Sequence, residues 1–208
     1  LLFLPNLLLK LSGTRLDSII PGVTEEDLKA MISAGEEEGV IEMSEGEMIH
    51  SIFELGDTAV REIMVPRVNI VAVSEDAPLT GVMRTIVESG FSRLPVYQGS
   101  IDRIVGIIYV KDVLARVVAP SGGPDTTVAR DCMRTPLYVP ETRRLQSLLR
   151  DLQDRKVQMA IVVDEYGGTS GLVTMEDVVE EIVGEIDDEY DRKAPEIQRS
   201  PDGSWLVK

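Results

Sequence analysis

The chain has 208 residues, 43% of them hydrophobic, which is enough for one large domain or two small ones with a real core. Its 21 Lys and Arg residues against 36 Asp and Glu residues give a net charge of −15, which repels a phosphate backbone and argues against nucleic acid as a partner. One cysteine and one histidine exclude a disulfide framework and a cysteine-based zinc site, and predict a reducing, cytosolic compartment.

The first 20 residues begin with the apolar run LLFLPNLLLKLSG, which Pro5, Asn6 and Lys10 interrupt. Such a run is too short to span a bilayer, and it lacks the basic region and cleavage site of a signal peptide. One interpretation is an amphipathic segment that packs on its own domain. The other, which we favour because the chain begins with leucine, is a juxtamembrane segment at the lipid interface.

Residues 21–60 are predicted to form a helical linker of two short helices. The first begins at Thr24, a capping residue followed by three acidic residues and then by apolar residues at helical spacing. The second has the same start signal in Ser44 and Glu47, and Gly56 ends it.

From about residue 61 the chain contains an internal repeat. The segment GIIYVKD at 106–112 aligns with GLVTMED at 171–177, an offset of 65 residues. Upstream of each, at 79–87 and 145–152, apolar residues recur at helical spacing. Each copy therefore predicts the order helix, strand, strand, helix.

The predicted strands are short apolar runs, joined into hairpins by turns rich in glycine. They cover 94–97, 104–109, 159–163 and 171–174, and a first strand is predicted in each copy over 68–73 and 137–139. One copy is too small to bury its faces well, so we expect an α/β (α+β) fold in which the two copies pack as a pseudo-twofold pair. The segment 119–124, rich in proline and glycine, is predicted to be an exposed linker.

These repeats resemble tandem cystathionine-β-synthase-type (CBS) domains. The runs FSRLPVY and QMAIVVDEYGGTSGLVTMEDVVEEIVGEIDDEYD are similar to the cytosolic region of the CorC/HlyC magnesium transporters, relatives of the CNNM proteins, and the likeness covers about residues 22–191. It implies a first CBS domain at 61–119, a second at 127–190, and the start of a truncated CorC-associated domain at 191–208. It also implies a transmembrane domain that precedes this region.

Thr174 and Asp177 lie where a predicted strand passes into a helix. The purely structural interpretation is a capping box, in which both side chains satisfy backbone groups. The functional interpretation is that the Asp177 carboxylate accepts hydrogen bonds from ribose hydroxyls, while the Thr174 hydroxyl and the helix amides face a phosphate. The resemblance to CBS domains favours the second, and the two are compatible.

The resemblance extends the candidate nucleotide site to the first repeat. Ser92 and Arg93 match a turn that contacts phosphate, Ile70 is a candidate wall for adenine, and Arg67 is a weaker phosphate candidate. The ordinary alternatives are a solvated cation for Arg93 and a core residue for Ile70. Tyr109 takes the place equivalent to Thr174, so we expect unequal clefts and one dominant nucleotide site per chain.

The segment 176–191 is dense in carboxylates. We interpret it as the wet face of an amphipathic helix, and a weak surface for divalent cations is the alternative, because Mg²⁺ prefers carboxylates and water. We expect no metal ion fixed by the protein alone. The chain also lacks the phosphate loop and the nucleophile and zinc motifs of common hydrolases, so we expect no catalysis.

The expected function is therefore a regulatory module on the cytosolic face of the membrane, within a multi-pass magnesium transporter of the CorC type. ATP with Mg²⁺ would bind between the CBS domains of a homodimer, and the linker would couple binding to the chain's own transmembrane domain. The alternatives are a sensor of AMP or ADP, and a dimerisation scaffold that binds no ligand. The net charge of −15 predicts that ATP affinity depends strongly on Mg²⁺.

Overall fold

The computed structural model describes residues 23–118 and 127–184 and two short strands at 197–199 and 205–207. The chain divides at about residue 50 into a small N-terminal unit and a larger unit. The predicted juxtamembrane segment, the linker at 119–124 and the acidic residues from 185 to 191 lie outside the described residues. The two short strands, β8 (Ile197–Arg199) and β9 (Trp205–Val207), pair antiparallel.

The N-terminal unit contains α2 (Glu25–Glu37) and the start of α3 (Met43–Glu54). The predicted start of the first helix is confirmed. The Thr24 hydroxyl accepts a hydrogen bond of 3.2 Å from the Asp27 amide, and the Asp27 carboxylate accepts one of 2.9 Å from the Thr24 amide. Each side chain thus satisfies an amide that the helix itself leaves unpaired.

The predicted start of the second helix is wrong. Helix α3 begins at Met43, one residue before Ser44, so Ser44 lies in its first turn. The Glu45 carboxylate accepts a hydrogen bond of 3.1 Å from the Glu42 amide and thereby supplies the polar contact that the prediction assigned to Ser44 and Glu47.

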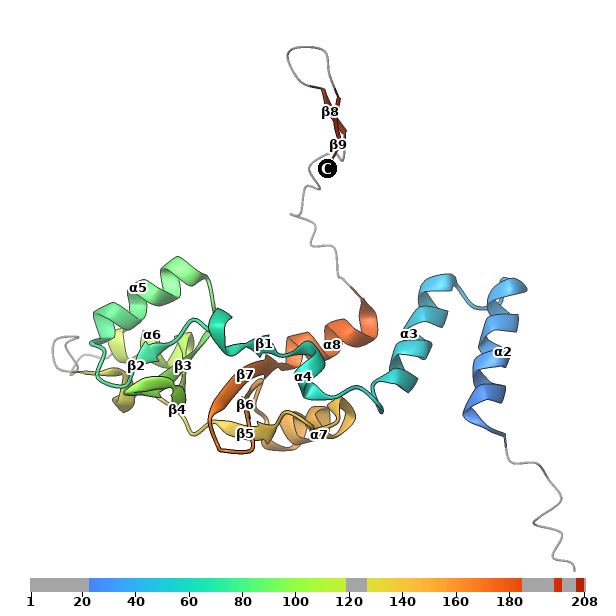
Figure 1. Ribbon diagram of the computed structural model, residues 1–208. Coiled ribbons are helices and arrows are strands. Elements are labelled where there is room, and N and C mark those ends of the chain that lie inside the picture. Colours follow the sequence, from blue (N-terminus) through green and yellow to red (C-terminus); the bar gives the residue numbers. More distant parts are fainter. Residues whose placement is uncertain (1–22, 119–126, 185–196, 200–204, 208) are drawn as a thin grey trace, which may run out of the picture. The chain divides into compact units, whose positions relative to one another are not determined.

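The larger unit contains the two predicted repeats, each a small sheet with two helices (Figure 1). The first sheet has the order β2-β3-β4, and the second has the order β1-β7-β6-β5. In each, an antiparallel hairpin lies beside a parallel strand, β2 on β3 and β5 on β6. The elements of the first repeat are β2 (Val73–Ser74), α5 (Leu79–Ser89), β3 (Arg93–Gln98), β4 (Ser100–Tyr109) and α6 (Val110–Val118). Those of the second are the 3-10 helix η3 (Ala129–Asp131), β5 (Leu137–Pro140), α7 (Leu145–Arg155), β6 (Met159–Val163), β7 (Thr169–Thr174) and α8 (Met175–Val183).

The strand predicted over 68–73 is wrong for most of its length. After the short helix α4 (Val60–Ile63) the chain forms the two-residue strand β1 (Val65–Pro66), then the 3-10 helix η2 (Arg67–Asn69), and is a strand again only from Val73. Pro66 has no amide hydrogen and cannot extend a ladder on both sides, which is why proline occurs in edge strands such as β1.

The strand β1 pairs with the sheet of the other repeat. Val65 lies opposite Leu172 of β7. At the equivalent place in the other repeat, Arg134 lies opposite Ile107 of β4. Both hydrogen bonds between Arg134 and Ile107 are 2.9 Å long. Leu172 and Ile107 are 65 residues apart, so the exchange follows the repeat. The first repeat therefore contributes a strand to the sheet of the second, and the second repeat contacts the sheet of the first through one isolated bridge.

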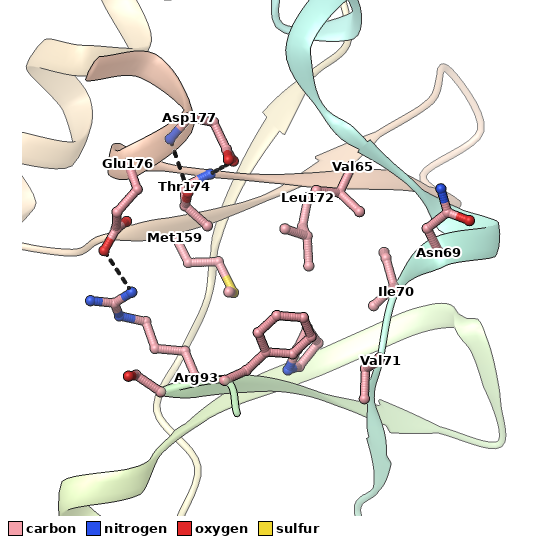
Figure 2. Close-up of a pocket in the computed structure, with 13 residues that line it drawn as sticks. Val65, Asn69, Ile70, Val71, Arg93, Met159, Leu172, Thr174, Glu176 and Asp177 are labelled. Carbon is pink, nitrogen blue, oxygen red and sulfur yellow. Dashed lines mark hydrogen bonds and ion pairs between the residues drawn. The ribbon is translucent and has the colours of Figure 1, made fainter. Parts of the chain in front are cut away.

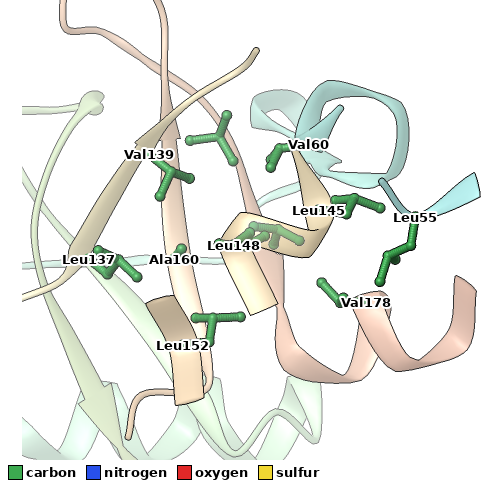
Figure 3. Close-up of a cluster of buried hydrophobic side chains, with 11 residues drawn as sticks. Leu55, Val60, Leu137, Val139, Leu145, Leu148, Leu152, Ala160 and Val178 are labelled. Carbon is green, nitrogen blue, oxygen red and sulfur yellow. The ribbon is translucent and has the colours of Figure 1, made fainter. Parts of the chain in front are cut away.

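Three clusters of buried side chains hold this unit together. One is centred on the second repeat, where Leu145, Leu148 and Leu152 of α7 pack against the sheet and against Val178 of α8, and it includes Leu55 and Val60 (Figure 3). A second cluster is centred on the first repeat and includes Ala129 and Cys132. The third joins the repeats and consists of Ile104, Ile107, Met159, Ile161 and Leu172. Because this third cluster is shared, burying it requires both repeats to be in place.

Two glycines permit the exchange of segments. A Cβ atom at Gly171 would lie 2.5 Å from the backbone oxygen of Val65 and 2.9 Å from the sulfur of Met64. At the equivalent Gly106, a Cβ atom would lie 2.3 Å from the sulfur of Met133. Each Met residue before the exchanged strand therefore crosses over a glycine of the opposite repeat, where any larger residue would collide with it.

We predict that Gly171→Ala destabilises the chain by about 1–3 kcal/mol, the usual cost of overpacking, because the backbone of Val65 cannot move aside as a flexible side chain does. The control is Gly81→Ala in helix α5, where the nearest atoms, those of Pro78, are 3.8 Å away. Alanine favours the helical state there, so this variant should be neutral or slightly more stable. Urea unfolding measures both, and equal stability of the two variants would contradict the crossing described above.

Among the residues that the structure describes, no helix is both long enough and apolar enough to cross a membrane.

Candidate functional site

A cavity of about 270 Å³ lies between the two repeats, lined by 13 residues from both of them. Five of the six residues that the sequence singles out line it, namely Ile70, Ser92, Arg93, Thr174 and Asp177. They come from three separate segments of the chain, which the pairing of β1 with β7 and the packing of β4 and η2 against β7 bring together.

The two sides of the cavity differ in chemistry. Figure 2 shows the apolar side chains of Val65, Ile70 and Leu172 on one side, and Arg93, Thr174, Glu176 and Asp177 on the other. An apolar pocket with a few convergent polar groups is the usual form of a small-molecule site. A ligand that fits it has a flat or apolar part and a polar or charged part.

Thr174 caps helix α8, as the structural interpretation predicted. Its hydroxyl accepts a hydrogen bond of 3.2 Å from the Asp177 amide, and Asp177 Oδ2 accepts one of 2.7 Å from the Thr174 amide. Among the described residues, the hydrogen bonds of this carboxylate involve Oδ2 alone. Since Oδ1 and the hydroxyl proton of Thr174 take no part in the cap, capping leaves both residues able to bind a ligand.

The turn that carries Ser92 and Arg93 depends on Gly90. Helix α5 ends there with a φ of +73°, a left-handed conformation that glycine adopts at little cost. The chain reverses within Phe91 and Ser92 and enters β3 at Arg93. This brings Phe91, Ser92 and Arg93 into the wall of the cavity.

Arg93 is not the solvated cation of the ordinary interpretation, because its side chain is only 15% exposed. Its Nη1 lies 3.1 Å from Oε1 of Glu176, and its Nη2 donates to Oε1 of Gln158. Both partners belong to the second repeat, whereas Arg93 belongs to the first. The guanidinium therefore links the two repeats on the polar side of the cavity, which we call the mouth, and an anionic ligand that pairs with it has to compete with Glu176.

Arg67 does not line the cavity. It begins the 3-10 helix η2, and its guanidinium forms an ion pair with Asp102 of β4. The charge that the prediction assigned to a phosphate is thus paired with a carboxylate of the protein outside the cavity, and the phosphate role of Arg67 stays a prediction.

The sequence reasoning missed several residues of the cavity wall. Val65 and Asn69 enter it because β1 and η2 lie against β7, which the predicted strand over 68–73 did not foresee. Glu176 lies within the motif that contains Thr174 and Asp177, yet it was assigned only to the acidic helix face. Met159 and Leu172 were predicted as strand residues. Because successive side chains of a strand point to opposite faces of the sheet, their positions in the strands could have indicated which face they line.

The acidic stretch is described only to residue 184. Within the described parts of the chain, no three carboxylate, histidine or cysteine side chains are gathered closely enough to hold a metal ion. Neither interpretation of residues 185–191 is tested, since they lie outside those parts.

The repeated unit and the cavity between its two copies define a class of protein. The family model described as "CBS domain" matches this chain twice, at residues 60–119 and 129–184, so the chain is a tandem CBS-domain protein. A solved structure of the CBS domain of a bacterial CNNM/CorC family Mg²⁺ transporter is 49% identical, with a TM-score of 0.75, over 80% of this chain and 99% of that one. The chain belongs to the CNNM/CorC family.

Relatives and further structures agree with this assignment. A UPF0053 protein of Mycobacterium tuberculosis is 44% identical over 83% of this chain and 40% of its own length, so the chain spans less than half of that relative. A CNNM/CorC CBS domain solved in complex with ATP is 51% identical, with a TM-score of 0.64, over 67% of this chain and 97% of that one. A CBS-domain pair from Klebsiella pneumoniae with bound AMP is 31% identical, with a TM-score of 0.54, over 61% of this chain and 99% of that one.

We predict that Thr174→Ala lowers the free energy of unfolding by about 1 kcal/mol, the typical cost of losing an N-cap side chain. Thr174→Ser should retain nearly the full stability, because it keeps the oxygen that accepts from the Asp177 amide. Denaturant unfolding without any ligand measures the difference. If the two variants were equally stable, the hydroxyl would not be acting as a cap.

Proposed function

We propose that this chain is the nucleotide-binding regulatory module of a CNNM/CorC magnesium transporter, and that it binds ATP together with Mg²⁺ in the cavity between its CBS domains. The observation that carries this proposal is the arrangement of the cavity, in which an apolar wall, the Asp177 carboxylate and the Arg93 guanidinium converge from both repeats. The related CBS domain solved with ATP supports the choice of ligand.

Each part of an adenine nucleotide has a counterpart in the cavity. The apolar side chains of Ile70, Met159 and Leu172 suit the adenine ring, and Oδ1 of Asp177, which the cap does not use, can accept from ribose hydroxyls. The phosphates belong at the charged mouth, beside Ser92, Arg93 and the N-terminus of α8. A volume of about 270 Å³ is small for a ligand pocket, so it suits the adenosine part, with the phosphates at the mouth.

Mg²⁺ has a physical role at this mouth. Glu176 is 60% exposed and faces Arg93, so its carboxylate lies where the phosphates belong. The repulsion between this carboxylate and ATP adds to that of a chain with a net charge of −15. Mg²⁺ bound to the phosphates supplies positive charge that offsets this repulsion. The protein does not supply it, because Arg93 is already paired with Glu176.

The function also requires a second copy of the chain and a membrane domain. Exposed apolar side chains lie on the helices of the CBS domains, Val87 on α5, Leu114 and Val118 on α6 and Val183 on α8. Such side chains suit a homodimer interface, because its burial stabilises both copies. We propose that ATP favours one arrangement of this dimer, and that residues 21–60 pass the change to the chain's transmembrane domain at the cytosolic face.

Two other functions compete with this proposal. A sensor of AMP or ADP is favoured by the related CBS pair that was solved with AMP. A scaffold that dimerises without ligand would use Thr174 and Asp177 only as a cap. Catalysis is not part of the proposal, and steady release of phosphate from ATP by the purified chain would require it to be added.

We predict that the purified chain binds ATP in the presence of Mg²⁺ and that Asp177→Asn weakens this binding by about 10- to 100-fold, the value of a hydrogen bond to a charged group. An asparagine at this position can still accept from the Thr174 amide, so stability should change little. Isothermal titration calorimetry and thermal unfolding measure the two effects.

The outcomes of this titration separate the three functions. AMP binding tighter than ATP binding would replace the proposal by the AMP sensor. Absence of binding by the wild-type chain to any of the three adenine nucleotides would favour the scaffold. Glu181→Gln serves as a control on the same helix, because Glu181 is exposed and does not line the cavity, and it should leave affinity unchanged.

We predict that chelating Mg²⁺ weakens ATP binding strongly in the wild-type chain and less in Glu176→Gln. Without Mg²⁺, Glu176→Gln should bind ATP about five-fold more tightly than the wild type does, because two charges at contact distance in water interact by about 1 kcal/mol. Glu181→Gln makes the same change in net charge away from the cavity. If both variants behaved alike, the overall net charge and not Glu176 would control the metal dependence. If the wild-type affinity did not respond to chelation, neither the net charge nor Glu176 would make ATP binding depend on Mg²⁺.

A further inference from the structure

The repeat gives the chain a second position equivalent to the cavity described above, around Asp112 and Tyr109, which we call the second cleft. The offset of 65 residues places Asp112 and Tyr109 where the first cleft has Asp177 and Thr174. The exchanged segments complete the comparison, because Arg134 pairs with Ile107 as Val65 pairs with Leu172. Arg134 therefore stands where the first cleft has the apolar wall residue Val65.

Arg134 binds the carboxylate at the heart of this second cleft. Its Nε and Nη2 donate hydrogen bonds of 2.7 and 2.8 Å to the two oxygens of Asp112, and its guanidinium carbon lies 4.7 Å from the centre of the Tyr109 ring. The guanidinium thus contacts both residues that correspond to the proposed ribose-binding pair. It also lowers the pKa of the Asp112 carboxyl below its ordinary value, which keeps the carboxylate charged.

The two equivalent carboxylates therefore differ in which of their oxygens can still accept a hydrogen bond from a ligand. In the first cleft, the described hydrogen bonds of Asp177 use Oδ2 alone. In the second, a bidentate, charge-assisted pair uses both oxygens of Asp112. A ribose that entered the second cleft would have to displace a guanidinium tethered to the same chain, whose effective concentration is high.

We propose that Arg134 is an internal occupant that closes the second cleft to nucleotide and so limits each chain to one bound ATP. This inference rests on the proposed function of the first cleft, and it assigns the asymmetry to a residue beyond Tyr109. The pair is not needed to hold the fold, since the Arg134 side chain is 52% exposed and exposed ion pairs contribute little to stability.

The opened second cleft would have its own charge. Lys111 stands in the place of Glu176, and Gln158 in that of Arg93. Lys111 lies 5.7 Å from the centre of the Tyr109 ring, beside the cleft. A nucleotide bound there would meet a lysine where the first cleft presents a glutamate, so its binding should depend less on Mg²⁺ than binding to the first cleft does.

The test copies the residues of the first cleft into the second with the double variant Arg134→Val and Tyr109→Thr. Calorimetry with ATP and Mg²⁺ should give one nucleotide per wild-type chain and two per variant chain. The matched control is Arg130→Val, which removes a side chain that is 53% exposed and paired with Asp76, away from either cleft. It should keep one nucleotide per chain.

A further variant assigns the new binding to the second cleft. Adding Asp177→Asn to the double variant should leave one tight nucleotide per chain, whereas Asp177→Asn alone should leave only the weakened one. The single variant Arg134→Val retains Tyr109 and should bind a second nucleotide more weakly than the double variant does. If thermal unfolding shows that the double variant does not fold, this single variant tests whether Arg134 closes the second cleft.

The outcomes distinguish this inference from the proposed function. One nucleotide per chain in both the wild type and the folded variants would overturn the role of Arg134 and leave the proposed function intact. Two nucleotides per wild-type chain would also overturn it, since the second cleft would be open with Arg134 in place. A wild-type chain that binds none refutes the proposed function, and the inference with it.

Discussion

The exchange of one short segment between the two repeats is the constraint on which the rest of the structure depends. Val65 completes the sheet of the second repeat at Leu172, and Arg134 bridges to the sheet of the first at Ile107. Both crossings need a glycine, because a Cβ atom at Gly171 or Gly106 would collide with the crossing segment. Val65 of one crossing segment packs against the apolar cluster shared by the repeats and also lines the cavity between them.

The same pseudo-symmetry produces two clefts whose charges differ. In the first, Arg93 is held between Glu176 and Gln158, and the Asp177 carboxylate keeps an oxygen outside the cap. In the second, the equivalent carboxylate is paired at both oxygens by an arginine of the same chain. Equivalent positions in the two repeats therefore do not make two equal binding sites, because a few side chains decide whether the recognition groups are available.

Local features of the site were predictable where the interacting residues are close in sequence. The cap formed by Thr174 and Asp177 spans three residues, and both the hydroxyl oxygen and the carboxylate contact the amides that the pattern indicates. The ion pair of Arg67 with Asp102 was not predictable, because the two residues are 35 positions apart and no local pattern reports such a pairing. The strand predicted over 68–73 was wrong for a related reason, since residues 67–69 form the 3-10 helix η2, which packs against β7 of the other repeat.

The sequence by itself determined the repeat, the order of helices and strands within each copy, and the capped helix that carries Thr174 and Asp177. Periodicity and capping are local, so they can be read along the chain. Only the tertiary structure decided that Val65 and Asn69 belong to the cavity, that Arg93 is held by Glu176, and that Arg134 pairs with Asp112. These contacts join residues from different repeats, and packing brings them together.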